Sequence, residues 1–106
     1  MPKNGHRLTV PELRLALHEF CEKHRIRKME VFGSTARGSA SSESDVDLLV
    51  TFDSPPNASA LLEMAGEVEE VIGAPVDFVL RTSLEKSQNR FARDDILASA
   101  VCLYGC

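Results

Sequence analysis

Two aspartates separated by one residue, Asp45 and Asp47, are the side chains of this sequence best suited to chemistry. They open a β-rich apolar run that ends at Phe52, so they are expected at the start of a strand. Alternate side chains of a strand share a face, and both carboxylates therefore point to the same side. A second run of this kind, residues 76–80, contains a third carboxylate, Asp77.

Three adjacent carboxylates repel one another unless a cation neutralises them. Sites rich in oxygen suit Mg²⁺, which binds through one or two carboxylates together with the phosphates of a substrate. Two such ions can hold the attacking and leaving oxygens of an in-line phosphoryl displacement. We therefore predict that Asp45, Asp47 and Asp77 are catalytic residues and metal ligands. Taken alone, an Asp-x-Asp pair in a strand is more simply explained by two solvated side chains.

A phosphate site is predicted just upstream, where Gly33 ends a short apolar run and Ser34 follows. Glycine permits an unusual backbone angle and the close approach of a ligand. If residues 34–38 form a helical turn, its free N–H groups create an anion site, to which Ser34 adds a hydroxyl and Arg37 a charged donor. Taken alone, the Gly-Ser pair is better explained as an ordinary turn.

The elements that position these residues predict an α/β (α+β) fold with a small mixed sheet packed by helices on one face. Thr9, Pro11 and Glu12 form a helix start, and apolar spacing predicts a helix over 11–24. Further strands are expected at 29–32, 45–52, 76–80 and 101–104, and further helices at 59–72, near 82–83 and at 88–100. The connection from 52 to 76 is long enough for a parallel crossover, which would bring the three aspartates to one face.

Leu49, Thr51 and Val79 lie further along the aspartate face of the same strands. Because soluble monomers seldom leave large apolar patches bare, these residues predict a docking surface for a protein partner. The competing interpretation is that a loop or the C-terminal segment folds over them.

Composition favours a single soluble domain over residues 1–106, with 43% apolar and 26% charged residues. No apolar run approaches the roughly 20 residues that cross a bilayer. The net charge of −4 argues against a broad surface for nucleic acid. Since no export signal is apparent, Cys21, Cys102 and Cys106 are interpreted as free thiols of a cytoplasmic protein.

The motifs combine into Gly33-Ser34, ten further residues, and then Asp45-x-Asp47. This pattern resembles the signature of the DNA polymerase beta nucleotidyltransferase superfamily. The sequence is most similar to the smallest branch of that superfamily, the minimal nucleotidyltransferase (MNT) domains, in the segments 31–38, 44–50 and 73–79. The resemblance extends from about Met29 to the C-terminus, with its signature region at 29–52.

The resemblance implies a polymerase beta-type fold in which Gly33, Ser34 and Arg37 bind the triphosphate of ATP and Asp45 and Asp47 hold two Mg²⁺ ions. It implies that the third carboxylate, on strand 76–80, orients or deprotonates the attacking hydroxyl. Members of this branch are similar to the antitoxins of HEPN/MNT toxin–antitoxin modules, whose partner is an all-helical HEPN-type ribonuclease. Some silence the toxin by moving AMP from ATP onto a tyrosine. We therefore expect a nucleotidyltransferase that modifies a HEPN-type toxin encoded next to it.

A second interpretation is an antitoxin that neutralises its partner by contact alone, with a vestigial site. The intact aspartates, together with Gly33 and Ser34, favour the enzyme. Transfer to a small molecule or to a nucleic acid is disfavoured, because an additional domain to hold the acceptor is not evident in this chain. A homo-oligomer is compatible with the sequence.

Overall fold

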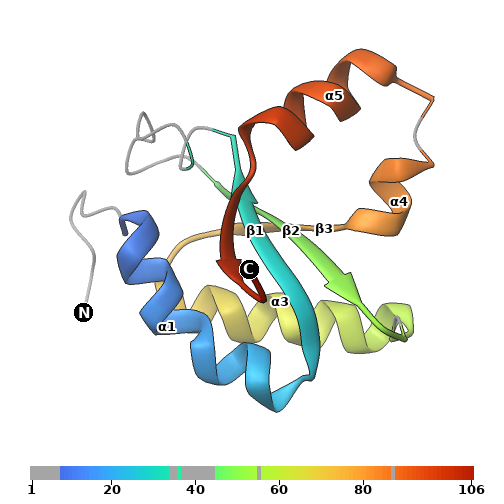
Figure 1. Ribbon diagram of the computed structural model, residues 1–106. Helices are drawn as coiled ribbons and strands as arrows, with labels where there is room; N and C mark the ends of the chain where they lie inside the picture. The colour runs from blue at the N-terminus through green and yellow to red at the C-terminus, as the bar shows by residue number, and fades with distance from the viewer. Residues whose placement is uncertain (1–7, 34–35, 37–44, 55, 87) are drawn as a thin grey trace.

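A four-stranded mixed sheet in the order β3-β2-β1-β4 forms the centre of the computed structural model (Figure 1). The structure describes residues 8–33, 36, 45–54, 56–86 and 88–106. β1 (Ile26–Phe32) pairs antiparallel with β2 (Val46–Phe52) and with β4 (Val101–Tyr104). β2 pairs in parallel with β3 (Val76–Leu80). The predicted mixed sheet and its parallel crossover are both confirmed.

Two long helices, α1 (Val10–Lys23) and α3 (Ala58–Ile72), pack on one face of the sheet. Thr9 and Glu12 form the predicted capping box at the start of α1. α3 ends at Gly73, whose φ of 72° is the left-handed conformation that glycine adopts readily. Even-numbered β2 residues complete this core, which includes Leu13, Leu17, Val46, Leu48, Val50 and Val68. No helix within the described ranges is long and apolar enough to cross a membrane.

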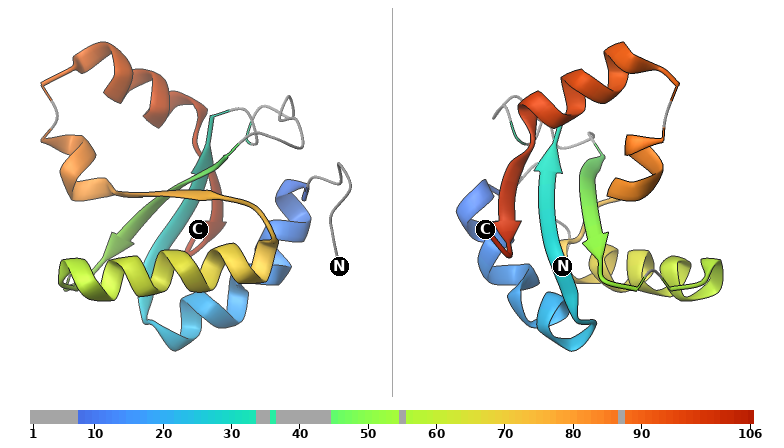
Figure 2. Two further views of the ribbon diagram at one scale, coloured as in Figure 1. Left: turned by 180° about the vertical axis from the view of Figure 1, so that it is seen from behind. Right: turned by 45° about the vertical axis from the view of Figure 1, so that its right-hand side comes forward.

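The opposite face of the sheet is also covered, in contrast to the expectation of helices on one face only. After β3 the chain forms α4 (Arg81–Glu85) and α5 (Arg90–Ser99), which stand on the side away from α1 and α3 (Figure 2). They complete a second core cluster, which consists of Phe32, Leu49, Leu84, Val79, Ile96, Leu97 and Ala100.

The prediction that Leu49, Thr51 and Val79 form an exposed docking surface is therefore wrong. Leu49 is fully buried, at 0% exposure, and Val79 and Thr51 are half-buried. The competing interpretation is confirmed, because the C-terminal segment folds over this face. The sequence pattern did not show what packs against the apolar side chains of this face. Residues later in the same chain bury them.

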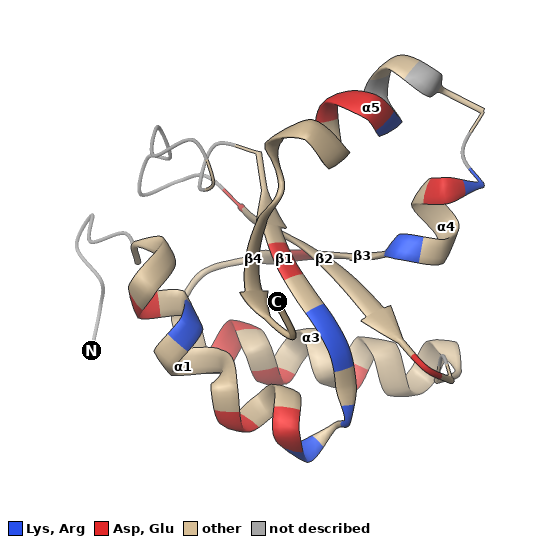
Figure 3. Ribbon diagram, in the orientation of Figure 1, with Lys and Arg blue, Asp and Glu red and all other residues tan. Residues whose placement is uncertain are grey.

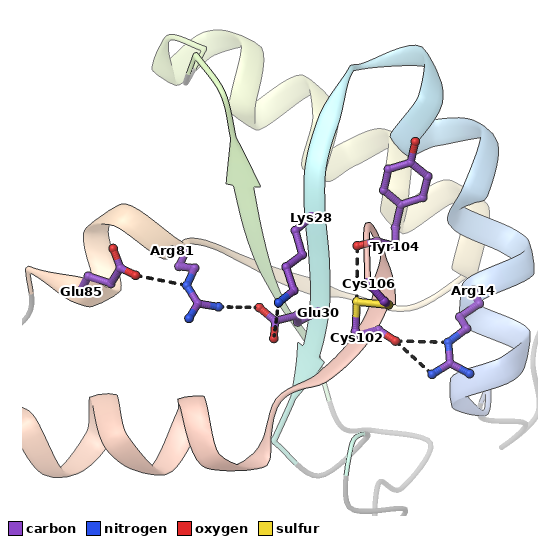
Figure 4. A network of polar contacts seen from close by, with 8 residues as sticks. All are labelled: Arg14, Lys28, Glu30, Arg81, Glu85, Cys102, Tyr104 and Cys106. Carbon is purple, nitrogen blue, oxygen red and sulfur yellow. Dashed lines mark hydrogen bonds and ion pairs between the residues drawn. A yellow bond between two sulfur atoms is a disulfide. The ribbon is translucent and has the colours of Figure 1, made fainter.

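Polar contacts fasten the C-terminal third of the chain to the sheet (Figure 4). Arg81 donates to a carboxylate oxygen of Glu30 on β1 at 2.8 Å and to Glu85 at 3.2 Å. Glu30 is only 8% exposed, so its ion pair with Arg81 compensates a buried charge. On the other side, the Arg14 guanidinium donates to the carbonyl oxygen of Cys102 at 3.0 and 3.2 Å. These contacts fix where β3 turns into α4 and where β4 lies against α1.

Cys102 and Cys106 form a disulfide, so the prediction of three free thiols is wrong for these two (Figure 4). Four residues of extended strand would separate the Cα atoms by about 13 Å. Gly105, with a φ of 77°, turns the chain so that they are 5.8 Å apart. Cys21 is free and buried, and burial, with a smaller effect of Glu22, raises its pKa to about 12. The cytoplasmic location stays a prediction.

Candidate active site

The predicted carboxylates come together where β2 and β3 begin. In the parallel pairing of these strands Asp47 lies opposite Asp77, with Val46 opposite Val76 on the other face. Asp45 directly precedes β2. Because both strands alternate in the same phase, Asp47 and Asp77 share one face of the sheet. This arrangement confirms the neighbouring strands and the shared face that the sequence predicted.

The three carboxylates also interact electrostatically. The pKa of Asp47 is raised above its ordinary value, first by burial and then by the negative charges of Asp77 and Asp45. Asp47 is half-buried, whereas Asp45 and Asp77 are exposed. The cluster is therefore open to a ligand on the side of the two exposed carboxylates, and a cation there would relieve their mutual repulsion.

This cluster does not enclose a metal ion by itself. Within the described ranges, no three His, Cys, Asp or Glu side chains are close enough together to hold one. Mg²⁺ seldom needs such a cage, since it usually binds through one or two carboxylates, substrate phosphates and water. The all-oxygen donor set of Asp45, Asp47 and Asp77 thus fits Mg²⁺ in the presence of a nucleotide.

Gly33, at the end of β1, lies directly against the Asp47 carboxylate. Its φ is 76°, and a Cβ atom built on it would lie 2.5 Å from Oδ2 of Asp47. The pairing of Phe32 with Asp47 across β1 and β2 causes this proximity. Only glycine leaves both the turn and the carboxylate undisturbed. Ser34 and Arg37, the other predicted phosphate-binding residues, lie outside the described residues, as does most of the predicted turn over 34–38.

A pocket of about 330 Å³ lies at the other end of the aspartate face. Its lining contains none of the three aspartates and consists of Arg27, Lys28, Thr51, Arg81, Thr82, Glu85 and Gly105. The buried hydroxyl oxygen of Thr51 has no hydrogen-bond partner in the described part of the chain. The pairing of Arg81 with Glu30, which helps to shape this region, joins residues 51 positions apart and had no signal in the sequence.

Comparison with known proteins identifies the family of the chain. Residues 13–102 match the family model described as the nucleotidyltransferase domain. The chain belongs to the nucleotidyltransferase domain family. The match includes Gly33 and all three aspartates, and it confirms the predicted class of enzyme.

Two individual relatives show which members of the family the chain is similar to. The chain is 38% identical over 82 residues to the protein adenylyltransferase MntA of Thermococcus cleftensis. The matched stretch covers 74% of this chain and 83% of that relative. It is 30% identical to a solved minimal nucleotidyltransferase, with a TM-score of 0.71 over 92% of this chain and 98% of the other. The fold predicted from the resemblance is thereby confirmed.

Solved toxin–antitoxin complexes contain chains of the same fold. One, crystallised with AMP-PNP, matches with a TM-score of 0.72 and 18% identity over 88% of this chain and 73% of that one. Another holds a tri-AMPylated HEPN toxin of Shewanella oneidensis with its MNT antitoxin. It matches with a TM-score of 0.59 and 17% identity over 89% of this chain and 73% of that one. At these identities the likeness shows the fold alone.

Proposed function

We propose that this protein is an antitoxin that transfers AMP from ATP to a hydroxyl of a HEPN-type toxin encoded next to it. The observation that carries the proposal is the register of β2 and β3, which places Asp47 beside Asp77 with Gly33 against the Asp47 carboxylate. The relative named protein adenylyltransferase MntA and the complex with an AMPylated HEPN toxin support the choice of AMP and of partner.

Each residue of the site is assigned a role. Gly33 leaves room for the triphosphate close to the backbone, and Ser34 and Arg37 bind its phosphate oxygens. Asp45, Asp47 and Asp77, together with phosphate oxygens of ATP, would hold Mg²⁺, which when bound neutralises phosphate charge and polarises the reacting phosphoryl group. Asp77 also orients the acceptor hydroxyl and takes up its proton.

The transfer is a balanced displacement at the α-phosphorus of ATP. The acceptor oxygen forms a bond to that phosphorus while the bond to the oxygen bridging the α- and β-phosphates breaks. The proton of the hydroxyl passes to Asp77, and pyrophosphate leaves. The exposure of Asp77 on an edge strand suits this role, because a protein acceptor reaches it without passing through the fold.

Labelled ATP tests the proposal directly. The chain is incubated with ATP labelled in the α-phosphate, Mg²⁺ and the HEPN-type protein encoded beside it, and label on that protein is the expected result. Asp47→Asn and Asp77→Asn are expected to abolish labelling. Toxin neutralised without label by the wild type and by both variants would instead establish the contact-only antitoxin.

The metal requirement has its own measurement. A ligand present at 100 times its dissociation constant stabilises the folded state by about 2.7 kcal/mol. Saturating ATP with Mg²⁺ is therefore expected to raise the melting temperature clearly, and ATP with excess chelator is not. Equal stabilisation under both conditions would count against a metal bound by the aspartates.

A further inference from the structure

An apolar groove of about 450 Å³ lies between α3 and β3, the edge strand of the sheet. Every side chain that lines it is apolar, and the set consists of Ala58, Leu61, Leu62, Ala65, Val76 and Phe78. Leu62 is 75% exposed. The groove is separate from the carboxylate cluster, since Val76 and Phe78 point to the face opposite that of Asp77.

Gly66 extends this surface along α3. Glycine inside a helix is less stable than alanine, so its presence usually has a packing reason. Here a Cβ atom would meet no atom within 4 Å, so no contact inside the described chain requires glycine. Ala58, Leu62 and Gly66 follow at intervals of four and therefore share one exposed side of α3. A small residue beside an exposed leucine permits another backbone to approach closely.

The groove favours a helix over an added strand. The carbonyl oxygen of Pro75 accepts from β2, so alternation turns the N–H of Val76 toward the free edge of β3. That N–H already donates to a carboxylate oxygen of Glu69 at 3.0 Å. An incoming strand would have to displace this bond, whereas a helix would pack on the ridge of α3 residues spaced four apart.

Charge defines the chemistry of the helix that fits. α3 carries Glu63, Glu67, Glu69 and Glu70 and no lysine or arginine. Figure 3 accordingly shows red and no blue along this helix. Glu67 is neutralised by Lys23 of α1, but Glu63 and Glu70 are exposed. The complementary helix therefore has an apolar stripe flanked by Lys or Arg. A second copy of this chain fits less well, because it brings the same acidic helix and a net charge of −4.

We propose that the α3–β3 groove docks an amphipathic, basic-flanked helix of the protein that accepts the nucleotidyl group. The proposal rests on the proposed function and adds the place where the partner binds. β3 forms one wall of the groove and carries Asp77 on its other face, so a partner held on this edge keeps its hydroxyl near the carboxylates. Holding two reactants in register in this way is a large part of catalysis by enzymes.

Two substitutions test the groove, with a matched control. Leu62→Glu places a carboxylate in the docked apolar contact, and it is expected to weaken binding of the HEPN-type protein encoded beside this chain about tenfold or more. Leu15→Glu makes the same change at another exposed leucine, on α1, and is expected to leave the affinity within about twofold of wild type. Gly66→Ala is expected to raise the melting temperature of the isolated chain while weakening the complex.

Affinity is measured by calorimetric titration, and stabilisation by ATP with Mg²⁺ checks that each variant is folded with an intact site. Wild-type affinity of Leu62→Glu overturns the groove proposal, as does the absence of any complex with the wild-type chain. Light scattering tests whether a second copy of this chain occupies the groove instead. The groove proposal is also overturned if the chain self-associates and Leu62→Glu abolishes this self-association while partner binding stays unchanged. The two proposals fail separately, because affinity tests the groove and transfer of label tests the function.

Discussion

Replacing Gly33 with alanine is expected to damage the site more than the fold. With a φ of 76°, the backbone of an L-residue there costs about 1–2 kcal/mol. The added Cβ would lie 2.5 Å from Oδ2 of Asp47, a distance that real Cβ contacts essentially never show. Asp47 is half-buried, so its carboxylate has room to rotate away while β2 stays paired. We therefore expect a loss of about 2 kcal/mol, or roughly 10 °C in melting temperature for a domain of this size.

Transfer of AMP is expected to fall much further, by about 10²-fold, because displacing a catalytic group by about 1 Å has effects of that order. Gly73→Ala is the control, since its φ of 72° imposes a similar backbone cost at the end of α3. Thermal melts and labelled transfer, measured below both melting temperatures, separate the two effects. Wild-type transfer by Gly33→Ala would refute the close approach of Gly33 and Asp47, as would an equal loss of transfer in Gly73→Ala.

Three further perturbations test other parts of the structure. Without divalent cations, Asp47→Asn is expected to raise the melting temperature slightly, because the raised pKa of Asp47 means that its ionised form opposes folding. This gain should be largest at neutral pH and vanish as the pH falls through the raised pKa toward the ordinary 3.8. Melting temperatures measured across that pH range test the prediction, and a lower melting temperature of Asp47→Asn than of the wild type would contradict it. Thr51→Val removes a buried hydroxyl without a partner in the described chain and is expected to stabilise the fold by about 1 kcal/mol, whereas a lower melting temperature would reveal a partner for the hydroxyl. Cys21, with its pKa of about 12, is expected to react with thiol reagents only after denaturation, and rapid labelling of the native chain would contradict its burial.

Local pattern was sufficient for most elements and for the centre of the site. The capping box at Thr9 predicted α1, and the apolar run after Pro75 predicted β3 with the bounds that the structure shows. The pairing of Asp47 with Asp77 followed from the alternation of strand side chains and from a connection long enough for a parallel crossover. These features depend on a few neighbouring residues or on chain length, which can be read along the sequence.

Other features depended on contacts between distant residues. The pattern showed that Leu49 needed an apolar neighbour, but α4 and α5 rather than a partner protein bury it. The proximity of Gly33 to Asp47 required the register of β1 with β2, and the Cys102–Cys106 disulfide required the turn at Gly105. Hydrophobic burial is non-directional, so apolar periodicity identifies which side chains leave water and not which segment covers them. Which segment covers them is determined by the packing of the whole chain.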